Sequence, residues 1–130
     1  MKQPNNGMFY DQWEFLQAGD VEVGTIKAEV LAANLMGEEF EEFRKEPLYN
    51  AGHAAVLGVN TIKEALDLMY VTAQYLNVTI GPEAATKCWD ALHANNMSKC
   101  IGGKLVKRAD GKVMKPDGFK KLDLSVLLQK

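Results

Sequence analysis

Apolar residues recur at helical spacing near the start of the chain. Between residues 8 and 17, Phe9, Trp13 and Leu16 follow one another at intervals of four and three residues, so they share one face of a helix. Such a stripe is typical of a helix that packs on a core. Stacking of the two aromatic rings on a nucleobase is the alternative, but the aliphatic Leu16 on the same face favours the core.

A second helix is predicted over 25–46, followed by a loop. The helix ends before Pro47, because a residue that precedes proline is disfavoured in helical geometry. The segment 47–58 is then predicted to be a loop, with a short helical turn at 53–57.

Two more helices are predicted further along the chain. Residues 61–77 are apolar almost all round, and Thr61-Ile-Lys-Glu64 resembles a capping box at their start, with Asn60 as the alternative cap. A capping role would compete with any other role of the glutamate. The last helix opens at Gly81-Pro82, since proline suits the first turn, and fades between residues 97 and 99.

The pattern changes after Gly102-Gly103, where short alternating runs of polar and apolar residues flank Asp110-Gly111. An Asp-Gly pair between such runs predicts a small β-hairpin. The expected fold class is therefore all-α, a four-helix bundle core with a small C-terminal β-hairpin or extended basic tail. We expect a single helical domain over 1–130, divided into the first helix and its connection (1–24), a helical core (25–99) and a basic tail (100–130).

Carboxylates interrupt the apolar faces of two predicted helices. At about 100° per residue, Glu39 and Glu42 lie within roughly 60° of each other. Four apolar residues share this arc: Ala32, Leu35, Met36 and Phe43. Glu64 and Asp67 repeat the three-residue spacing in the third helix, so we place all four carboxylates on buried faces, whereas Glu41 points toward solvent. An ionised carboxylate in apolar surroundings is prohibitively costly unless a cation or several hydrogen bonds hold its charge.

A bound cation is the simplest partner for these carboxylates. Arg44, Lys45 and Lys63 flank the clusters, so one or two basic side chains at most reach this layer. Ligands that are all oxygen favour a hard divalent ion, Mg²⁺ or its substitute Mn²⁺, held together with waters and phosphate oxygens. Neither cluster contains the histidine that di-iron bundles use. The residues therefore predict a Mg²⁺ site in the helical core.

Composition places the chain among ordinary globular proteins. It has 130 residues, of which 47% are hydrophobic, enough for one domain with its own core. No apolar run reaches eighteen residues, and the first seven lack the apolar stretch of a signal peptide, so we expect a cytoplasmic protein without a membrane partner. Cys88 and Cys100 are too few for a metal cluster, and we expect them to stay reduced and to pack.

The net charge of −2 hides an asymmetry along the chain. Residues 99–121 contain eight basic and two acidic side chains, a net charge of +6, whereas the first 98 residues contain six basic and fourteen acidic ones, a net charge of −8. An acidic helical body followed by a basic tail suits a site that binds metal at one end and polyphosphate at the other.

Two ordered motifs give a resemblance to a known family. Glu38-Glu39-x-x-Glu42 and, after twenty-one residues, Glu64-x-x-Asp67 resemble the EExxE…ExxD signature of the MazG-like all-α nucleoside triphosphate pyrophosphohydrolases. The stretch from His93 to Lys99, followed by Arg108 to Lys115, resembles the ending of the branch related to phosphoribosyl-ATP pyrophosphohydrolase. This chain departs from that branch at Asn95, where serine is usual, and at Lys121-Leu122, where proline is common.

The resemblance implies hydrolysis of a nucleoside triphosphate to the monophosphate and pyrophosphate. It also implies assembly as a homodimer or homotetramer, which the all-round apolar helix 61–77 favours independently. Glu39, Glu42, Glu64 and Asp67 would hold one or two Mg²⁺ ions, and Glu38 would accept the proton of the attacking water or complete the metal shell. Four residues would contact the phosphates or sugar of the nucleotide: Asn96, Lys99, Lys107 and Arg108.

Other functions remain open at this stage. The same metal site would serve hydrolysis of phosphoribosyl-ATP or of a guanosine tetraphosphate alarmone. A non-catalytic, metal-stabilised helical module whose basic tail binds nucleic acid is a third alternative. Because Phe119 is the tail's one aromatic residue, stacking on single strands has little support, and we do not expect a nucleic-acid partner.

Overall fold

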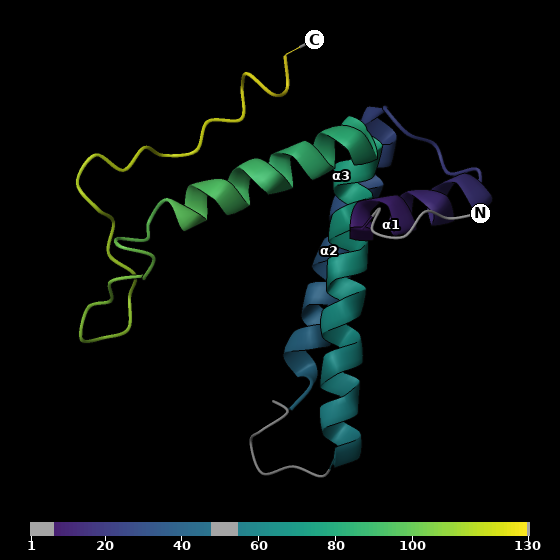
Figure 1. The fold of residues 1–130 in the computed structure, drawn as a ribbon. Coiled ribbons are helices and arrows are strands. Elements are labelled where there is room, and N and C mark those ends of the chain that lie inside the picture. Colours follow the sequence, from purple (N-terminus) through teal and green to yellow (C-terminus); the bar gives the residue numbers. More distant parts are fainter. Residues whose placement is uncertain (1–6, 48–54, 130) are drawn as a thin grey trace. The chain divides into compact units, whose positions relative to one another are not determined.

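The computed structural model describes residues 7–47 and 55–129, and these residues form an all-α structure. They contain three helices, α1 (Gly7–Ala18), α2 (Ile26–Lys45) and α3 (Ala55–Met97), and within the described ranges no β-strand (Figure 1). None of the described helices is long and apolar enough to cross a membrane. The all-α class is confirmed, with three helices in place of the four expected.

The ends of α2 follow from local sequence signals. Thr25 has extended backbone geometry, and its hydroxyl accepts a hydrogen bond from the Ala28 N–H at 3.1 Å, which caps the helix. Glu46 leaves the helix with φ −82° and ψ 143°, the extended conformation that a following proline favours. The prediction of a helix over 25–46 is confirmed to within one residue at each end.

The start of α3 differs from the prediction. The helix begins at Ala55, so Thr61 lies in its second turn and does not cap it. The Thr61 side chain is buried, and its hydroxyl donates to the backbone carbonyl of Pro47. The capping box at Thr61, and the alternative cap at Asn60, are therefore wrong, and the carboxylate of Glu64 is free of a capping role. The rest of the predicted loop, residues 48–54 with His53, lies outside the described residues.

A break at Gly81 explains the missing fourth helix. Gly81 has φ 83° and ψ 164°, a conformation that only glycine adopts without strain, and Pro82 follows it inside α3. The expected third and fourth helices are thus two segments of one element, joined without a loop. The chain divides after Pro82 into two compact units, which are described separately below. The single domain expected from the length stays a prediction.

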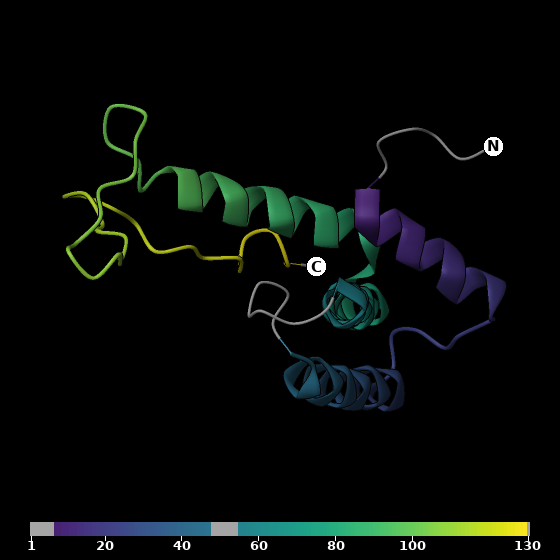
Figure 2. The same ribbon diagram turned by 90° about the horizontal axis from the view of Figure 1, so that it is seen from below.

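The first unit is built from α1, α2 and the segment of α3 before Gly81. α2 and this segment lie side by side and run in opposite directions, and α1 packs across them (Figures 1 and 2). Leu16, Ala28, Ala32 and Val78 form its buried cluster, with Trp13, Val21 and Tyr75 packed against them. The two alanines leave room for α2 to approach its neighbours closely. Phe9 is also buried, which favours the core over base stacking for this aromatic stripe.

The second unit combines the last part of α3 with an extended tail. The Asp110-Gly111 turn forms as expected, because the Gly111 N–H donates to the Arg108 carbonyl at 2.9 Å and the Arg108 N–H donates to the Lys112 carbonyl at 2.8 Å. The flanking runs make only isolated bridges, Lys107 with Val113 and Ile101 with Lys104, so the predicted hairpin strands are not present among the described residues. A two-stranded hairpin without a third strand or a packed face is only marginally stable.

Candidate functional site

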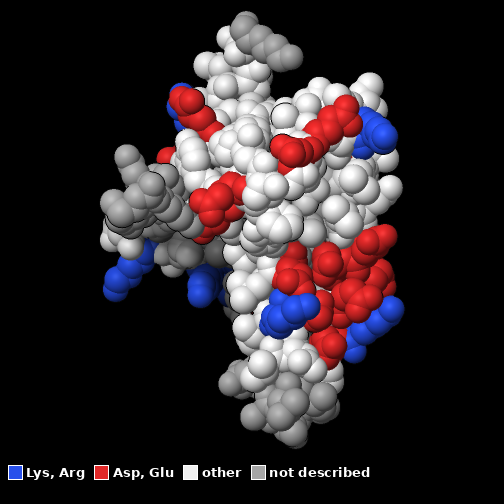
Figure 3. All heavy atoms as spheres, turned by 90° about the vertical axis from the view of Figure 1, so that its right-hand side faces the viewer, with Lys and Arg blue, Asp and Glu red and all other residues white. Residues whose placement is uncertain are grey.

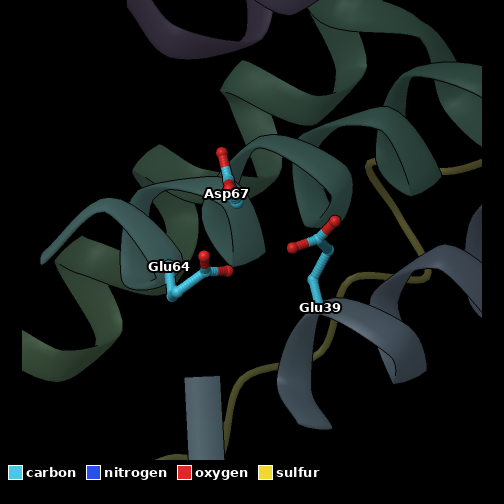
Figure 4. Close-up of side chains that lie close together, drawn as sticks. All are labelled: Glu39, Glu64 and Asp67. Atoms are coloured by element: carbon cyan, nitrogen blue, oxygen red, sulfur yellow. The ribbon is translucent and has the colours of Figure 1, made fainter. Parts of the chain in front are cut away.

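Three carboxylates from two helices converge in the first unit. Glu39 on α2 points toward Glu64 and Asp67 on α3, and one carboxylate oxygen of each lies within 4.8 Å of the others (Figure 4). The three-residue spacing places Glu64 and Asp67 on the same side of α3, and the antiparallel packing of α2 brings Glu39 opposite them. Three of the four predicted metal ligands are therefore neighbours in space.

A hollow of about 400 Å³ surrounds this triad. Its lining is almost entirely charged: Glu38, Glu39, Glu42, Lys63, Glu64 and Asp67. Figure 3 shows acidic side chains gathered at this part of the surface, with basic ones beside them. Five carboxylates and one ammonium group leave four formal negative charges. This all-oxygen donor set with excess negative charge fits Mg²⁺ or Mn²⁺.

The burial of these carboxylates differs from the prediction. Glu39, Glu64 and Asp67 are half-buried, and Glu38 and Glu42 are exposed, so none of them lies in an apolar core. The buried positions on α2 are Ala28 and Ala32, which lie nearer to its start. The hollow opens to solvent instead, and a cation can enter it directly. Glu42 lines the hollow but is not one of the three converging ligands.

The charge of Glu39 is disfavoured by its surroundings. Partial burial, followed by the neighbouring carboxylates of Asp67 and Glu64, raises the pKa of Glu39 above its usual range, and Lys63 opposes this effect. Like charges held this close repel one another in the absence of a cation. A divalent cation bound among these carboxylates would attract each of them and so offset their mutual repulsion.

Lys63 is part of this site, which the sequence did not predict. Its Nζ lies 2.6 Å from Asp67 Oδ2 and 3.6 Å from Glu64 Oε1. The hydrogen bond to Asp67, and the negative charge around it, raise the pKa of Lys63 above the ordinary lysine value. From the sequence, Lys63 is expected only at the flank of the acidic cluster. Its four-residue spacing from Asp67, which puts both on one helix face, is the signal that identifies it.

The residues predicted to bind phosphate all belong to the second unit. Lys99 donates to Asn96 Oδ1 at 3.2 Å, and its Nζ lies over the Phe119 ring, 5.9 Å from the ring centre. Lys107 is exposed. Arg108 is paired with Asp110, whose Oδ2 lies 2.7 Å from Arg108 Nη2. Their contact with a substrate, like the base role of the exposed Glu38, stays a prediction.

The two departures from the resembling motif lie together in this second unit. The Asn95 side-chain amide donates to the Lys120 carbonyl at 2.8 Å, immediately before Lys121-Leu122. Asn95, Lys121 and Leu122 also line one hollow of about 610 Å³. The asparagine therefore ties the tail to α3 at the point where the tail sequence itself departs from that motif.

Comparison with known proteins does not identify the chain. No protein-family model and no curated protein matches it. The functional inference therefore rests on the motif residues and on their geometry.

Proposed function

We propose that this protein is a Mg²⁺-dependent nucleoside triphosphate pyrophosphohydrolase of the MazG-like kind. The observation that supports this most is the convergence of Glu39 with Glu64 and Asp67 across two helices. Two helices bring these three carboxylates to one place, and a divalent cation is a suitable shared partner for such a group.

In this proposal the protein acts mainly by positioning and by charge. A bound Mg²⁺ would neutralise phosphate oxygens and lower the pKa of a bound water. Glu39, Glu64 and Asp67 would hold the ion, and Glu42, which also lines the hollow, would hold one of its waters. Glu38, another exposed residue of the lining, would accept a proton from the attacking water. Lys99, Lys107 and Arg108 would bind the phosphates, and Asn96 the sugar or a phosphate.

We also propose that the protein is a homodimer or homotetramer. Val59, Ile62, Leu66 and Met69 recur at intervals of three and four residues along α3, and each is at least 49% exposed. Four large apolar side chains in one row form a patch that monomeric proteins rarely expose. A second copy of the same helix offers a matching surface by two-fold symmetry.

The test is pyrophosphate release from a panel of ribonucleoside and deoxyribonucleoside triphosphates, with phosphoribosyl-ATP and guanosine tetraphosphate included. We expect turnover of at least one triphosphate with Mg²⁺ and none with a chelator. Glu39→Gln should lose at least about 100-fold in kcat, because an ion-binding carboxylate is removed.

Glu41→Gln is the matched control. Glu41 is on α2, is paired with Arg44 at 3.4 Å, and does not line the hollow. It should keep wild-type activity. If the protein hydrolysed only phosphoribosyl-ATP or only guanosine tetraphosphate, that compound would be its substrate instead of a nucleoside triphosphate. Absence of turnover on the whole panel, or equal rates with and without chelator, would reject the enzyme in favour of a binding module.

A further inference from the structure

Lys63 lies against two of the three carboxylates that would bind a metal ion. Its ammonium group contacts Asp67 and Glu64, which are two of the three converging carboxylates. Among the residues that line the hollow, it is the one that carries a positive charge. The Lys63 ammonium group would therefore compete with a metal cation for the negative charge of these two carboxylates.

Helix stabilisation alone does not explain this pairing. In an i,i+4 pair the acidic residue stabilises a helix better when it comes first, and here the lysine comes first. The Glu83–Lys87 pair, at 3.3 Å in the second unit, has the favourable order and so offers a direct comparison. Moreover, Lys63 contacts two carboxylates, whereas a pair that only stabilises the helix needs one.

We propose that Lys63 is a built-in counter-ion that holds Glu64 and Asp67 together in the metal-free protein and is displaced when the metal binds. This inference rests on the proposed function, since it assumes that the triad binds a divalent cation. The lysine side chain is long and 67% exposed, so it moves away from the carboxylates without disturbing the helices. Lys63 thereby stabilises the metal-free protein and weakens the affinity for metal.

The two effects have opposite signs, which separates this role from a purely structural one. Replacing Lys63 by methionine keeps most of the aliphatic chain and removes the charge. We expect Lys63→Met to lower the melting temperature in chelator, because the carboxylates then repel one another without compensation. We expect the same variant to bind Mn²⁺ roughly 2- to 5-fold more tightly than the wild type, the range for a partly exposed ion pair. If Lys63 merely supported the fold, its replacement would lower both the melting temperature in chelator and the affinity for Mn²⁺.

The experiment measures Mn²⁺ affinity by isothermal titration calorimetry and thermal unfolding in chelator for the wild type and four variants. Lys63→Arg keeps the charge and should match the wild type. Lys63→Gln repeats the charge removal with a polar side chain, in case the methionine variant folds poorly. Lys87→Met is the control, and it should leave the Mn²⁺ affinity unchanged.

The outcomes distinguish this inference from the proposed function. If the wild type does not bind Mn²⁺, both fail. If the wild type binds Mn²⁺ but Lys63→Met and Lys63→Gln bind it equally or more weakly, the counter-ion role of Lys63 is refuted and the metal site stands. Tighter binding together with lower stability in chelator supports the counter-ion role.

Discussion

The side-chain amide of Asn77 on α3 donates to Gln12 Oε1 on α1 at 2.9 Å and to the Phe9 carbonyl at the same distance. Asn77 is 1% exposed and Gln12 is fully buried, so water does not replace these bonds. We expect Asn77→Ala to lower the free energy of unfolding by about 2–4 kcal/mol, because it removes two buried hydrogen bonds and takes the Asn77 donor from the buried Gln12 Oε1. Urea denaturation measures this change.

Thr79→Ala is the control for this prediction. Thr79 is exposed two residues further on, and its hydroxyl bonds only to the Tyr75 carbonyl of its own helix, at 2.6 Å. Its replacement should change the free energy of unfolding by less than about 0.5 kcal/mol. Equal stability of the two variants would mean that the Asn77 amide does not hold α1 to α3.

A second prediction concerns the pH dependence of stability in the absence of metal. The raised pKa of Glu39 means that its ionised form disfavours the folded state. This penalty is fully present above the folded-state pKa, is relieved as the pH falls through it, and is absent below the ordinary value of 4.5. We therefore expect Glu39→Gln to melt at a higher temperature than the wild type at pH 7 in chelator.

The difference in melting temperature should close as the pH falls to about 4, where the wild-type glutamate is also neutral. The carboxylate of Glu41 is paired with Arg44, so the Glu41→Gln variant should not melt at a higher temperature than the wild type. A Glu39→Gln protein that is less stable than the wild type at pH 7 would contradict the repulsion inferred among the three carboxylates.

A third prediction tests Lys99 as a phosphate ligand. Lys99→Ala should lower kcat/KM roughly 10- to 100-fold, the cost of one charge-assisted hydrogen bond. Circular dichroism should show unchanged helix content. Lys104→Ala removes a lysine from the neighbouring turn, where the backbone and not the side chain bonds to Ile101, and it should have little effect. Equal activity of the two variants would exclude Lys99 from substrate binding.

A fourth prediction separates two roles of Arg108. Its pairing with Asp110, which also accepts from the Lys112 N–H at 3.1 Å, lowers the pKa of Asp110 and organises the turn. Arg108→Ala and Asp110→Ala both break the ion pair, but only the first removes a positive charge from the tail. If Arg108 binds phosphate, its variant loses roughly 10-fold or more in kcat/KM relative to Asp110→Ala. Equal losses would assign Arg108 to the turn alone.

The fifth prediction concerns assembly. Light scattering at micromolar concentration should find a dimer or tetramer for the wild type. The double variant Leu66→Lys with Met69→Lys, which charges the exposed row on α3, should be monomeric. Val126→Lys changes a more exposed apolar residue in the tail and should leave the mass unchanged. A monomeric wild type would overturn the proposed oligomer.

Local signals predicted those parts of the fold that depend on neighbouring residues. The stop before Pro47 predicted the end of α2 to within one residue, because it acts within one helical turn. The predicted capping box at Thr61 was wrong because the Thr61 hydroxyl donates to the Pro47 carbonyl. This contact spans fourteen residues, so no local pattern reveals it. The Asp110-Gly111 turn formed for local reasons, but strands need partners, and pairing is decided by tertiary packing.

In the candidate site, too, local spacing predicted some features, whereas others depend on how the helices pack. The three-residue spacing of Glu64 and Asp67 was enough to place both on one side of a helix, and the matching arc on the second helix pointed to Glu39. Burial was not predictable, because it depends on how α2 and α3 pack and on which of their faces stay uncovered. Glu42 shares the arc of Glu39 and yet is exposed, although it also lines the hollow.

The three carboxylates come from two helices, so an ion bound to all three would connect α2 to α3. A cation shared by Glu39 and Glu64 is a cross-link between distant parts of the chain, comparable to a disulfide but opened by a chelator rather than by a reductant. It closes the whole segment between the two residues into a loop, and its strength depends on the free metal concentration. At a concentration one hundred times the Kd, it adds about 2.7 kcal/mol to the stability of the helical pair. If the proposed ion binds, the metal content of the surroundings would thus set how firmly α2 and α3 are joined.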